Sequence, residues 1–199
     1  MKEIQCEQRS DEWYSARCGV PTASNFDKIV TSTGKPSKQK EKYLYKIAGE
    51  YVSGKCEESY QNDAMIRGCE MEDEARKLYE MMTDFTVRKA GFCIGDPVFE
   101  YGASPDGFVD KAGLIEIKCP SISVHVEYVL GWKLPTKYIQ QVQGQLLVTG
   151  RDWCDFISYY PGLKPMCVRV FRDEAFIQLL RAELETFCGQ LKDIIKKIK

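Results

Sequence analysis

The segment 114–118, Leu-Ile-Glu-Ile-Lys, is the part of this 199-residue chain that most restricts its fold. Successive side chains of a β-strand point to opposite faces of the sheet. Glu116 and Lys118 would therefore share one face of a strand, while Ile115 and Ile117 point from the other. The pattern predicts a strand with one face against an apolar core and with an acid and an amine on the opposite face.

An aspartate stands just ahead of this strand, in the turn Pro105-Asp106-Gly107. Taken alone, that tripeptide is only a turn signature. The runs Gly107–Asp110 and Leu114–Lys118 read as two successive strands, which places Asp106 at the mouth of a hairpin. A solvent-exposed, ion-paired strand face would explain the acid and the lysine, but it would not require an aspartate at this position.

Two carboxylates and a lysine are the groups that metal-assisted hydrolysis of a phosphodiester needs. Carboxylate oxygens bind hard cations, and Mg²⁺ keeps several waters when the protein supplies few ligands. The cation lowers the pKa of a bound water and neutralises charge on the phosphate. A lysine beside that water orients it or accepts its proton, and its ammonium stabilises developing negative charge. We therefore predict metal-dependent cleavage at Asp106, Glu116 and Lys118.

Hydrophobic periodicity elsewhere predicts one domain of the α/β (α+β) class, with a central mixed β-sheet flanked by helices. Ser10 is placed to cap the first helix, and Asp173 to begin the last. Helices are expected at 11–17, 22–30, 37–52, 61–82, 121–130, 136–148 and from 173 onward. Strands are expected at 85–89, 92–94, 98–101, 107–110, 114–118, 156–160 and 167–171.

The nine cysteines are odd in number, and no two are spaced as CxxC. Several of them, such as Cys154, Cys167 and Cys188, lie in apolar stretches, where a reduced thiol packs as a small hydrophobe. We interpret them as core thiols in a reducing compartment; an iron–sulfur site is the alternative, although the clustered ligands it needs are missing. The amino terminus lacks the apolar core of a secretory signal, and no apolar run is long enough to span a bilayer. We therefore expect a cytoplasmic protein that does not associate with a membrane.

Charge is distributed unevenly along the chain. The net charge is −1, so the molecule as a whole is not a basic nucleic-acid binder. Within 28–46, however, six lysines face the single acid Glu41: Lys28, Lys35, Lys38, Lys40, Lys42 and Lys46. This segment reads either as a solvated helix face or as a surface that follows DNA phosphates.

Four blocks of residues, spread over about residues 9–150, stand in a fixed order. They are Trp13-x3-Arg17-x-Gly19-Val-x-Thr22-Ala-Ser24, Gly68-x3-Glu72-x2-Ala75-Arg76-x2-Tyr79, Ser104-Pro-Asp106-Gly with Leu114-Ile-Glu116-Ile-Lys118-Cys-Pro, and Tyr138-x2-Gln141-Val-Gln143. In this order they resemble the lambda exonuclease, or YqaJ-type viral recombinase, family of PD-(D/E)xK nucleases. The resemblance implies a restriction-endonuclease-like core in a single nuclease domain, with 1–60 as a helical end-binding region, 61–172 as the catalytic core and 173–199 as the C-terminal helix.

Carried onto matching positions, the resemblance implies a metal site. Asp106 and Glu116 would bind metal through their side chains, and the backbone carbonyl of Ile117 would add a ligand. Glu72 matches the helix carboxylate that assists a second metal, with Glu70 as the alternative on a helix crowded with acids. The implied cofactor is Mg²⁺, two ions per active site, with Mn²⁺ able to substitute.

The resemblance also gives roles to three further residues. Lys118 takes the part of the catalytic lysine, which positions or activates the attacking water. Gln141 matches a helix glutamine that helps to hold the nucleophile or the metal-bound water. Tyr138 lies three positions earlier on the same helical face, where it either supports the site or simply packs.

A second group of residues matches positions that bind a terminal 5′-phosphate: Arg17, Ser24 and Ser104. Guanidinium and hydroxyl groups suit an oxyanion, because arginine presents a planar fork of donors. The alternative for Arg17 is a salt bridge at a helix end. A pocket of this kind favours 5′→3′ digestion of duplex ends, which leaves 3′ single-stranded tails.

The resemblance thus implies a Mg²⁺-dependent 5′→3′ exonuclease of phage or prophage recombination, acting on double-stranded DNA with free ends in a bacterial or phage-infected cell. It also implies a ring-shaped homotrimer and a partner single-strand annealing protein. The alternatives are a structure-specific or restriction-type endonuclease on the same core, and a catalytically silent DNA-binding subunit. His125, the only histidine, is expected to be exposed or to pack. Trp13 and Trp132 could stack on nucleic-acid bases, although aromatic residues at helix ends more often pack in the core.

Overall fold

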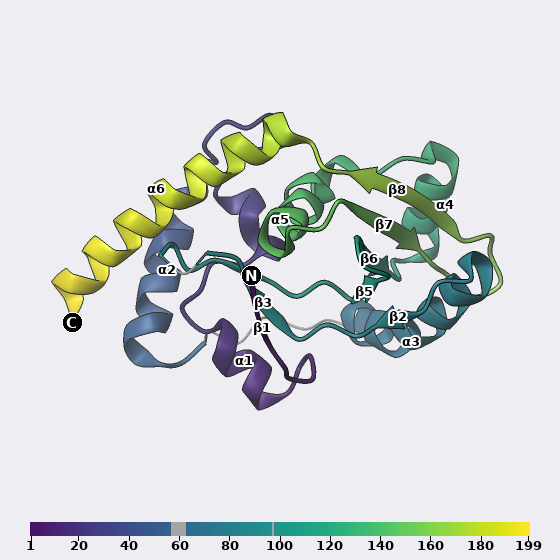
Figure 1. Cartoon of the computed structure of the whole chain (residues 1–199), viewed down its shortest axis with the longest axis horizontal. Helices are drawn as coiled ribbons and strands as arrows, with labels where there is room; N and C mark the ends of the chain where they lie inside the picture. The colour runs from purple at the N-terminus through teal and green to yellow at the C-terminus, as the bar shows by residue number, and fades with distance from the viewer. Residues whose placement is uncertain (57–62, 97) are drawn as a thin grey trace.

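A five-stranded mixed sheet forms the centre of the computed structural model, which describes residues 1–56, 63–96 and 98–199, with the backbone alone at 63–69 (Figure 1). The strands lie in the order β2 (Val87–Arg88), β5 (Gly107–Val109), β6 (Gly113–Lys118), β7 (Trp153–Ser158) and β8 (Met166–Phe171). Only β6 and β7 run parallel; the other neighbours are antiparallel. The expected α/β (α+β) fold with a central mixed sheet is confirmed.

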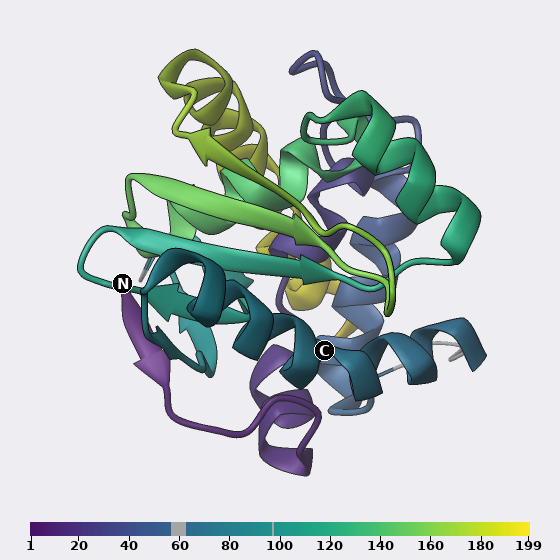
Figure 2. The same cartoon turned by 90° about the vertical axis from the view of Figure 1, so that its right-hand side faces the viewer.

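Helices cover both faces of this sheet (Figure 2). On one face α3 (Asp63–Thr83) packs Ala75 and Tyr79 against Ile115 and Ile117, as the alternation along 114–118 predicts. On the other face the larger core gathers η1 (Ala23–Lys28), α2 (Lys40–Ser53), α5 (Ile139–Thr149) and α6 (Glu174–Ile198). Strand β6 is therefore fixed on both sides, and its carboxyl end carries Lys118.

A second, three-stranded antiparallel sheet is made of β1 (Lys2–Ile4), β3 (Phe92–Ile94) and β4 (Gly102–Ala103). The sequence interpretation missed β1, and its strand at 98–101 is wrong. The Asp96 carboxylate accepts hydrogen bonds from the amides of Val98 and Phe99, at 2.7 and 2.9 Å, so this stretch turns instead of extending. The strand begins only at Gly102.

Capping residues set the ends of two helices that matter for the site. The Ser10 hydroxyl accepts from the amide of Trp13 and begins α1 (Asp11–Arg17), and the Asp173 carboxylate accepts from the amide of Phe176 at the start of α6. Gly19 follows α1 with a φ of +72°, and a Cβ there would lie 2.7 Å from the backbone of Tyr51. Glycine is therefore required where the chain leaves α1 and passes α2.

Most of the other predicted elements lie close to those observed. The helix expected at 22–30 is the 3₁₀ helix η1, the one expected at 37–52 begins only at Lys40, and residues 61 and 62 of the long helix lie outside the described residues. The segment 121–148 splits into α4 (Ile122–Gly131), η2 (Thr136–Tyr138) and α5.

The cysteines that the structure describes are free thiols. Cys154 and Cys188 are buried and Cys167 is partly buried, so these three pack as the sequence predicts. Among the described residues, none of the helices is long and apolar enough to cross a membrane.

Candidate active site

Glu116 is the best-fixed acid of the predicted site. Glu116 is 1% exposed. Each of its carboxylate oxygens accepts a hydrogen bond from a side-chain amide of α5: Oε1 from Gln141 and Oε2 from Gln145, each at 2.6 Å. The ammonium of Lys118 lies 2.5 Å from Oε1. Residues two apart on β6 thus share one face, as predicted, and two glutamines one helical turn apart face them from α5.

Asp106 lies at the mouth of the β5–β6 hairpin, where the turn signature places it. Its Oδ2 accepts the backbone N–H of Ile117 at 2.6 Å, which ties the turn to β6. Burial raises the pKa of the Asp106 carboxyl well above its ordinary value, and the nearby charges of Glu116 and Glu72 raise it further. The negative charges of Glu116 and Glu72 thus act on Asp106, and a cation bound at Asp106 would relieve that repulsion.

Lys118 supplies the positive charge at this end of β6. Burial on its own would lower the pKa of the Lys118 ammonium, but the negative charges of Glu116 and Asp106 outweigh that effect and raise it. The ammonium also lies 5.2 Å from the centre of the Tyr138 ring. Lys118 is thus protonated at neutral pH beside the two carboxylates.

Glu72 and Glu70 differ in their placement on α3. Glu70 is exposed, whereas the side chain of Glu72 is 15% exposed and forms ion pairs with Arg9, at 2.5 Å, and Arg76, at 3.6 Å. Glu72 is also the residue on α3 whose charge acts on Asp106. The structure therefore brings Glu72, and not Glu70, to the site.

The donor set suits a magnesium ion. The described residues contain no ready-made cluster of three or more carboxylate, thiolate or imidazole ligands. Mg²⁺ needs no such cage, because it usually binds one or two protein carboxylates and keeps several waters. Asp106 and Glu116, with the backbone carbonyl of Ile117, would hold the ion, which would supply an activated water and neutralise phosphate charge.

The pocket predicted for a terminal phosphate lies beside Asp106. The Arg17 guanidinium donates to the Ser104 hydroxyl at 3.1 Å, and to the hydroxyls of Thr22 and Ser24 at 3.5 Å each. Trp13 donates its indole N–H to Ser104 at 2.8 Å, and its ring lies 4.0 Å from the Arg17 guanidinium carbon. The structure thus brings together Arg17, Ser24 and Ser104.

Arg17 is held by hydroxyl groups and aromatic rings. The ion pairs of the described residues do not include it, so the helix-end salt bridge considered as its alternative is not present among them. Burial lowers the pKa of Arg17 to about 10, which leaves it charged at neutral pH. A partly buried cation that forms no ion pair with the described residues suits an anionic ligand.

Comparison with known proteins decides the family. Residues 12–152 match the YqaJ-like viral recombinase domain. The chain belongs to this family. Among solved structures, the alkaline exonuclease LHK-Exo from Laribacter hongkongensis is 35% identical, with a TM-score of 0.87 over 95% of this chain and 96% of that chain. The complex of LHK-Exo with dAMP gives 36% identity and a TM-score of 0.86, covering 96% of both chains.

More distant comparisons add less. A phage-related exonuclease from Haemophilus somnus 129PT is 16% identical, with a TM-score of 0.72 over 90% of this chain and 96% of that chain, and at that identity it shows the fold alone. No curated protein matches the chain. The resemblance to YqaJ-type recombinases, read from four sequence blocks, is confirmed.

Sequence reasoning missed three residues that the structure places at the site: Gln145, Trp13 and Arg9. Gln145 carried a usable signal, because it follows Gln141 by four positions on one helix. His125 is fully buried, with Nδ1 2.8 Å from the Ser158 hydroxyl and Nε2 3.1 Å from the Lys164 carbonyl, so it packs in the core and is not exposed. Trp13 belongs to the pocket rather than to simple helix-end packing.

Two of the six lysines of 28–46 form ion pairs: Lys40 with Glu183 at 2.7 Å and Lys46 with Glu50 at 3.6 Å. Lys28 donates a hydrogen bond to the neutral side chain of Asn25. That this segment follows DNA phosphates remains a prediction.

Proposed function

We propose that this protein is a Mg²⁺-dependent 5′→3′ exonuclease that degrades one strand of linear double-stranded DNA from 5′-phosphorylated ends, giving 3′ single-stranded tails for recombination. The observation that carries the proposal is one juxtaposition: the Arg17 pocket and the Asp106 turn share the segment 104–106, so an anion site adjoins the carboxylates. Family membership and the likeness to an alkaline exonuclease make the chain a deoxyribonuclease of the exonuclease type. The metal, the polarity and the role in recombination belong to the proposal.

Each residue at the end of β6 has a distinct task in the proposed reaction. Glu116 is oriented by the amides of Gln141 and Gln145, so its oxygens point to one place without rearrangement. Asp106 is held by the Ile117 amide. Lys118 is protonated, so it orients the attacking water and stabilises the charge that develops on the phosphate. Glu72 would assist in holding a second Mg²⁺, and Mn²⁺ would substitute for either ion.

End recognition would belong to the pocket. The guanidinium of Arg17, with the hydroxyls of Ser24 and Ser104, would bind the terminal 5′-phosphate, and the Trp13 ring would hold the guanidinium in place. With the terminal phosphate held there, the first internucleotide phosphate would reach the carboxylates. The same geometry would release mononucleotides in succession from the 5′ end.

The proposal also includes an oligomeric state and a partner protein, and both are supported by family membership. The protein would form a ring-shaped homotrimer around DNA, and a single-strand annealing protein would take up the 3′ tail. Light scattering on the purified protein measures the first: a mass of three chains is expected, and a mass of one chain contradicts it.

The test of the proposed function is digestion of linear duplex labelled at the 5′ or the 3′ end of one strand, with phosphate or hydroxyl at the 5′ terminus. The expected result is early release of the 5′ label, a need for Mg²⁺ and slower digestion of hydroxyl ends. Early release of the 3′ label overturns the polarity. Cleavage of covalently closed circles instead assigns a structure-specific or restriction-type endonuclease, and DNA binding without cleavage in Mg²⁺ or Mn²⁺ assigns a silent subunit.

A further inference from the structure

Two stretches of the chain carry basic residues and no acid. Residues 128–151 and 156–172 contain no aspartate or glutamate, in a chain whose net charge is −1. Their basic residues include Lys133 and Lys137, between α4 and α5, and Lys164, between β7 and β8. A local excess of one sign in an otherwise balanced chain indicates a surface for a partner of opposite charge.

All three lysines are exposed, and two of them, Lys137 and Lys164, lie against aromatic rings. The Lys164 ammonium lies 4.9 Å from the centre of the Trp132 ring, and the Lys137 ammonium lies 5.4 Å from that of Tyr128 and 5.0 Å from that of Tyr138. The ion pairs found among the described residues include none of the three. Their charge is therefore available to a ligand.

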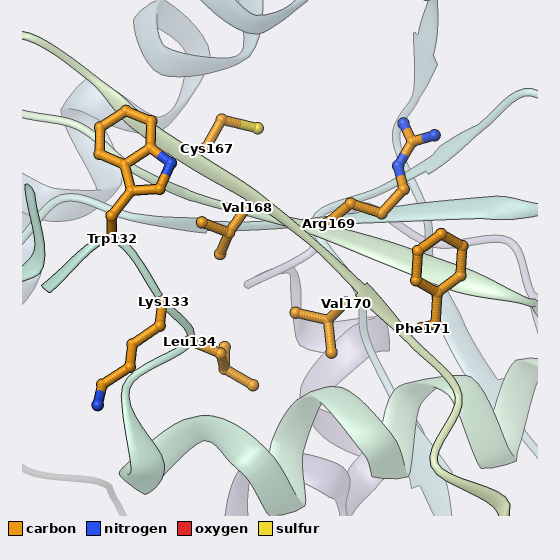
Figure 3. Close-up of a pocket in the computed structure, with 8 residues that line it drawn as sticks. All are labelled: Trp132, Lys133, Leu134, Cys167, Val168, Arg169, Val170 and Phe171. Atoms are coloured by element: carbon orange, nitrogen blue, oxygen red, sulfur yellow. The ribbon is translucent and has the colours of Figure 1, made fainter.

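An open groove adjoins this basic surface (Figure 3). It lies between the loop 132–134 and strand β8, which is an edge of the five-stranded sheet, and its volume is about 660 Å³. Val168 and Val170 line it, with Trp132 and Phe171 toward its two ends. Trp132 is 47% exposed and Phe171 65%, so a large ring meets solvent toward each end of the groove, with the lysines at the Trp132 end (Figure 3).

Trp132 also has an unusual backbone. Trp132 ends α4 with a φ of +43°, in the left-handed region that residues other than glycine seldom adopt. The indole is exposed, and the Lys164 ammonium lies close to its ring. An exposed indole with a cation beside it is a platform on which a nucleic-acid base stacks.

The basic surface is continuous with the active site. The Tyr138 ring lies 5.2 Å from the Lys118 ammonium and 5.0 Å from that of Lys137, so one ring contacts the catalytic lysine and the nearest surface lysine. Helix α1, which carries Arg17, and helix α4, which ends at Trp132, lie on opposite sides of the end of β6 (Figure 2). A ligand on the groove would therefore leave the phosphate pocket free.

We propose that the groove beside β8 binds single-stranded DNA, namely the undigested strand that the exonuclease leaves behind. The inference rests on the proposed function for the source of that strand. Lysines on the rim would contact phosphates, while Trp132, Phe171 and the two valines would receive unpaired bases. Duplex DNA keeps its bases stacked inside, so an apolar and aromatic groove favours the single strand.

The test measures binding of a fluorescein-labelled oligothymidylate in EDTA, where no turnover occurs, over a range of salt. The triple variant Lys133→Ala, Lys137→Ala, Lys164→Ala is compared with a control of equal charge change, Lys111→Ala, Lys196→Ala, Lys197→Ala, whose lysines are exposed and lie outside the two acid-free stretches. The slope of log K against log salt is expected to fall by about two in the triple variant and to stay unchanged in the control. Trp132→Ala is expected to weaken binding about tenfold.

Several results would overturn the proposal. Equal slopes in the two triple variants would do so, as would unchanged affinity in Trp132→Ala. If the wild type binds a labelled oligoglutamate peptide, and the triple variant Lys133→Ala, Lys137→Ala, Lys164→Ala loses that binding but keeps its binding of oligothymidylate, the groove is assigned to an acidic protein segment instead. Binding is measured in EDTA and does not depend on cleavage. If the wild-type protein digests no linear duplex, the proposed function is wrong, but the salt dependence of oligothymidylate binding still tests the groove.

Discussion

Two buried carboxylates lie on neighbouring parallel strands of the central sheet, Glu116 on β6 and Asp155 on β7, and they have opposite kinds of partner. Asp155 is 3% exposed, accepts two hydrogen bonds from the Arg169 guanidinium at 2.8 Å each and one from the Tyr79 hydroxyl at 2.7 Å. Glu116 meets two neutral amides and one ammonium, with Asp106 nearby.

The difference separates a structural acid, Asp155, from the proposed catalytic acid, Glu116. A bidentate guanidinium saturates the charge of Asp155, and each partner is fixed by the fold. The amides around Glu116 orient its oxygens without cancelling their charge, and the further carboxyls of Asp106 and Glu72 add negative charge. Burial alone therefore does not separate the two acids: Glu116 shares the Lys118 ammonium with Asp106, whereas Asp155 is paired with the Arg169 guanidinium.

The largest effect on the cleavage rate is expected from Lys118, which forms an ion pair with Glu116. Lys118→Ala should lower the rate of nucleotide release by about 10³-fold, because the ammonium that stabilises the developing charge is lost. Binding of duplex DNA should be retained. Single-turnover digestion and fluorescence anisotropy measure the two, and a variant with wild-type turnover would remove Lys118 from the mechanism.

Asp155→Asn should show the reverse behaviour. Removing the charge that partners Arg169 should lower the free energy of unfolding by about 2 kcal/mol, because the Arg169 side chain is partly exposed and its lost ion pair is screened. The cleavage rate at 25 °C should stay that of the wild type. Urea unfolding and the same digestion assay test this, and a loss of turnover with unchanged stability would reverse the assignment of the two acids.

Arg17→Ala should impair recognition of the 5′-phosphorylated DNA end and leave the cleavage step itself unchanged. The rate on 5′-phosphorylated ends should fall about 10- to 100-fold, the value of hydrogen bonds to a charged group, while hydroxyl ends lose little. Arg17→Lys should give an intermediate ratio, because an ammonium keeps the charge and loses the planar fork. Equal losses on both kinds of end would argue against the phosphate pocket.

Gln145→Leu should lower kcat about tenfold with little change in KM, because the buried glutamine orients Glu116 and does not contact substrate. Gln141→Leu provides the matched comparison from the same helix, since it removes the donor to the other oxygen. Steady-state kinetics on duplex ends separate the two parameters. A change in KM alone would place Gln145 in DNA binding.

A smaller effect is expected from pH. The Asp106 carboxyl has a raised pKa, so the folded protein keeps a proton that the unfolded chain loses above its ordinary pKa of 3.8. Its contribution to stability is present below that pH and is lost as the pH rises through the folded pKa. Mg²⁺ replaces the proton, so stabilisation by Mg²⁺ should increase with pH by about 1 kcal/mol in thermal unfolding. Asp106→Asn should abolish the increase.

Local sequence rules predicted the elements that hold the site. Alternation along 114–118 gave the buried and functional faces of β6, and the Pro-Asp-Gly turn placed Asp106, because both depend on near neighbours. The helix at 136–148 was expected, but Gln145 as a second partner of Glu116 was not, since that contact joins residues 29 apart in sequence. The strand expected at 98–101 failed because one aspartate side chain bonds two backbone amides there.

The pocket lay further from such rules. Arg17 and Ser104 were paired by the family resemblance alone, and nothing local to either residue indicates that Trp13 would join them by donating to Ser104. Likewise, on a helix crowded with acids only the family spacing favours Glu72 over Glu70, and the charge of Glu72 acts on Asp106 in the fold, whereas Glu70 is exposed.

The central claim is that the carboxylates around Lys118 form a Mg²⁺ site for phosphodiester hydrolysis. The most direct measurement is the initial rate of mononucleotide release from a 5′-phosphorylated linear duplex as Mg²⁺ is titrated into metal-free protein, for the wild type and for Asp106→Asn. The account predicts no release in EDTA, a saturable rise with Mg²⁺ in the wild type, and no rise in the variant. An equal rate in EDTA, or an unchanged titration in Asp106→Asn, would contradict it.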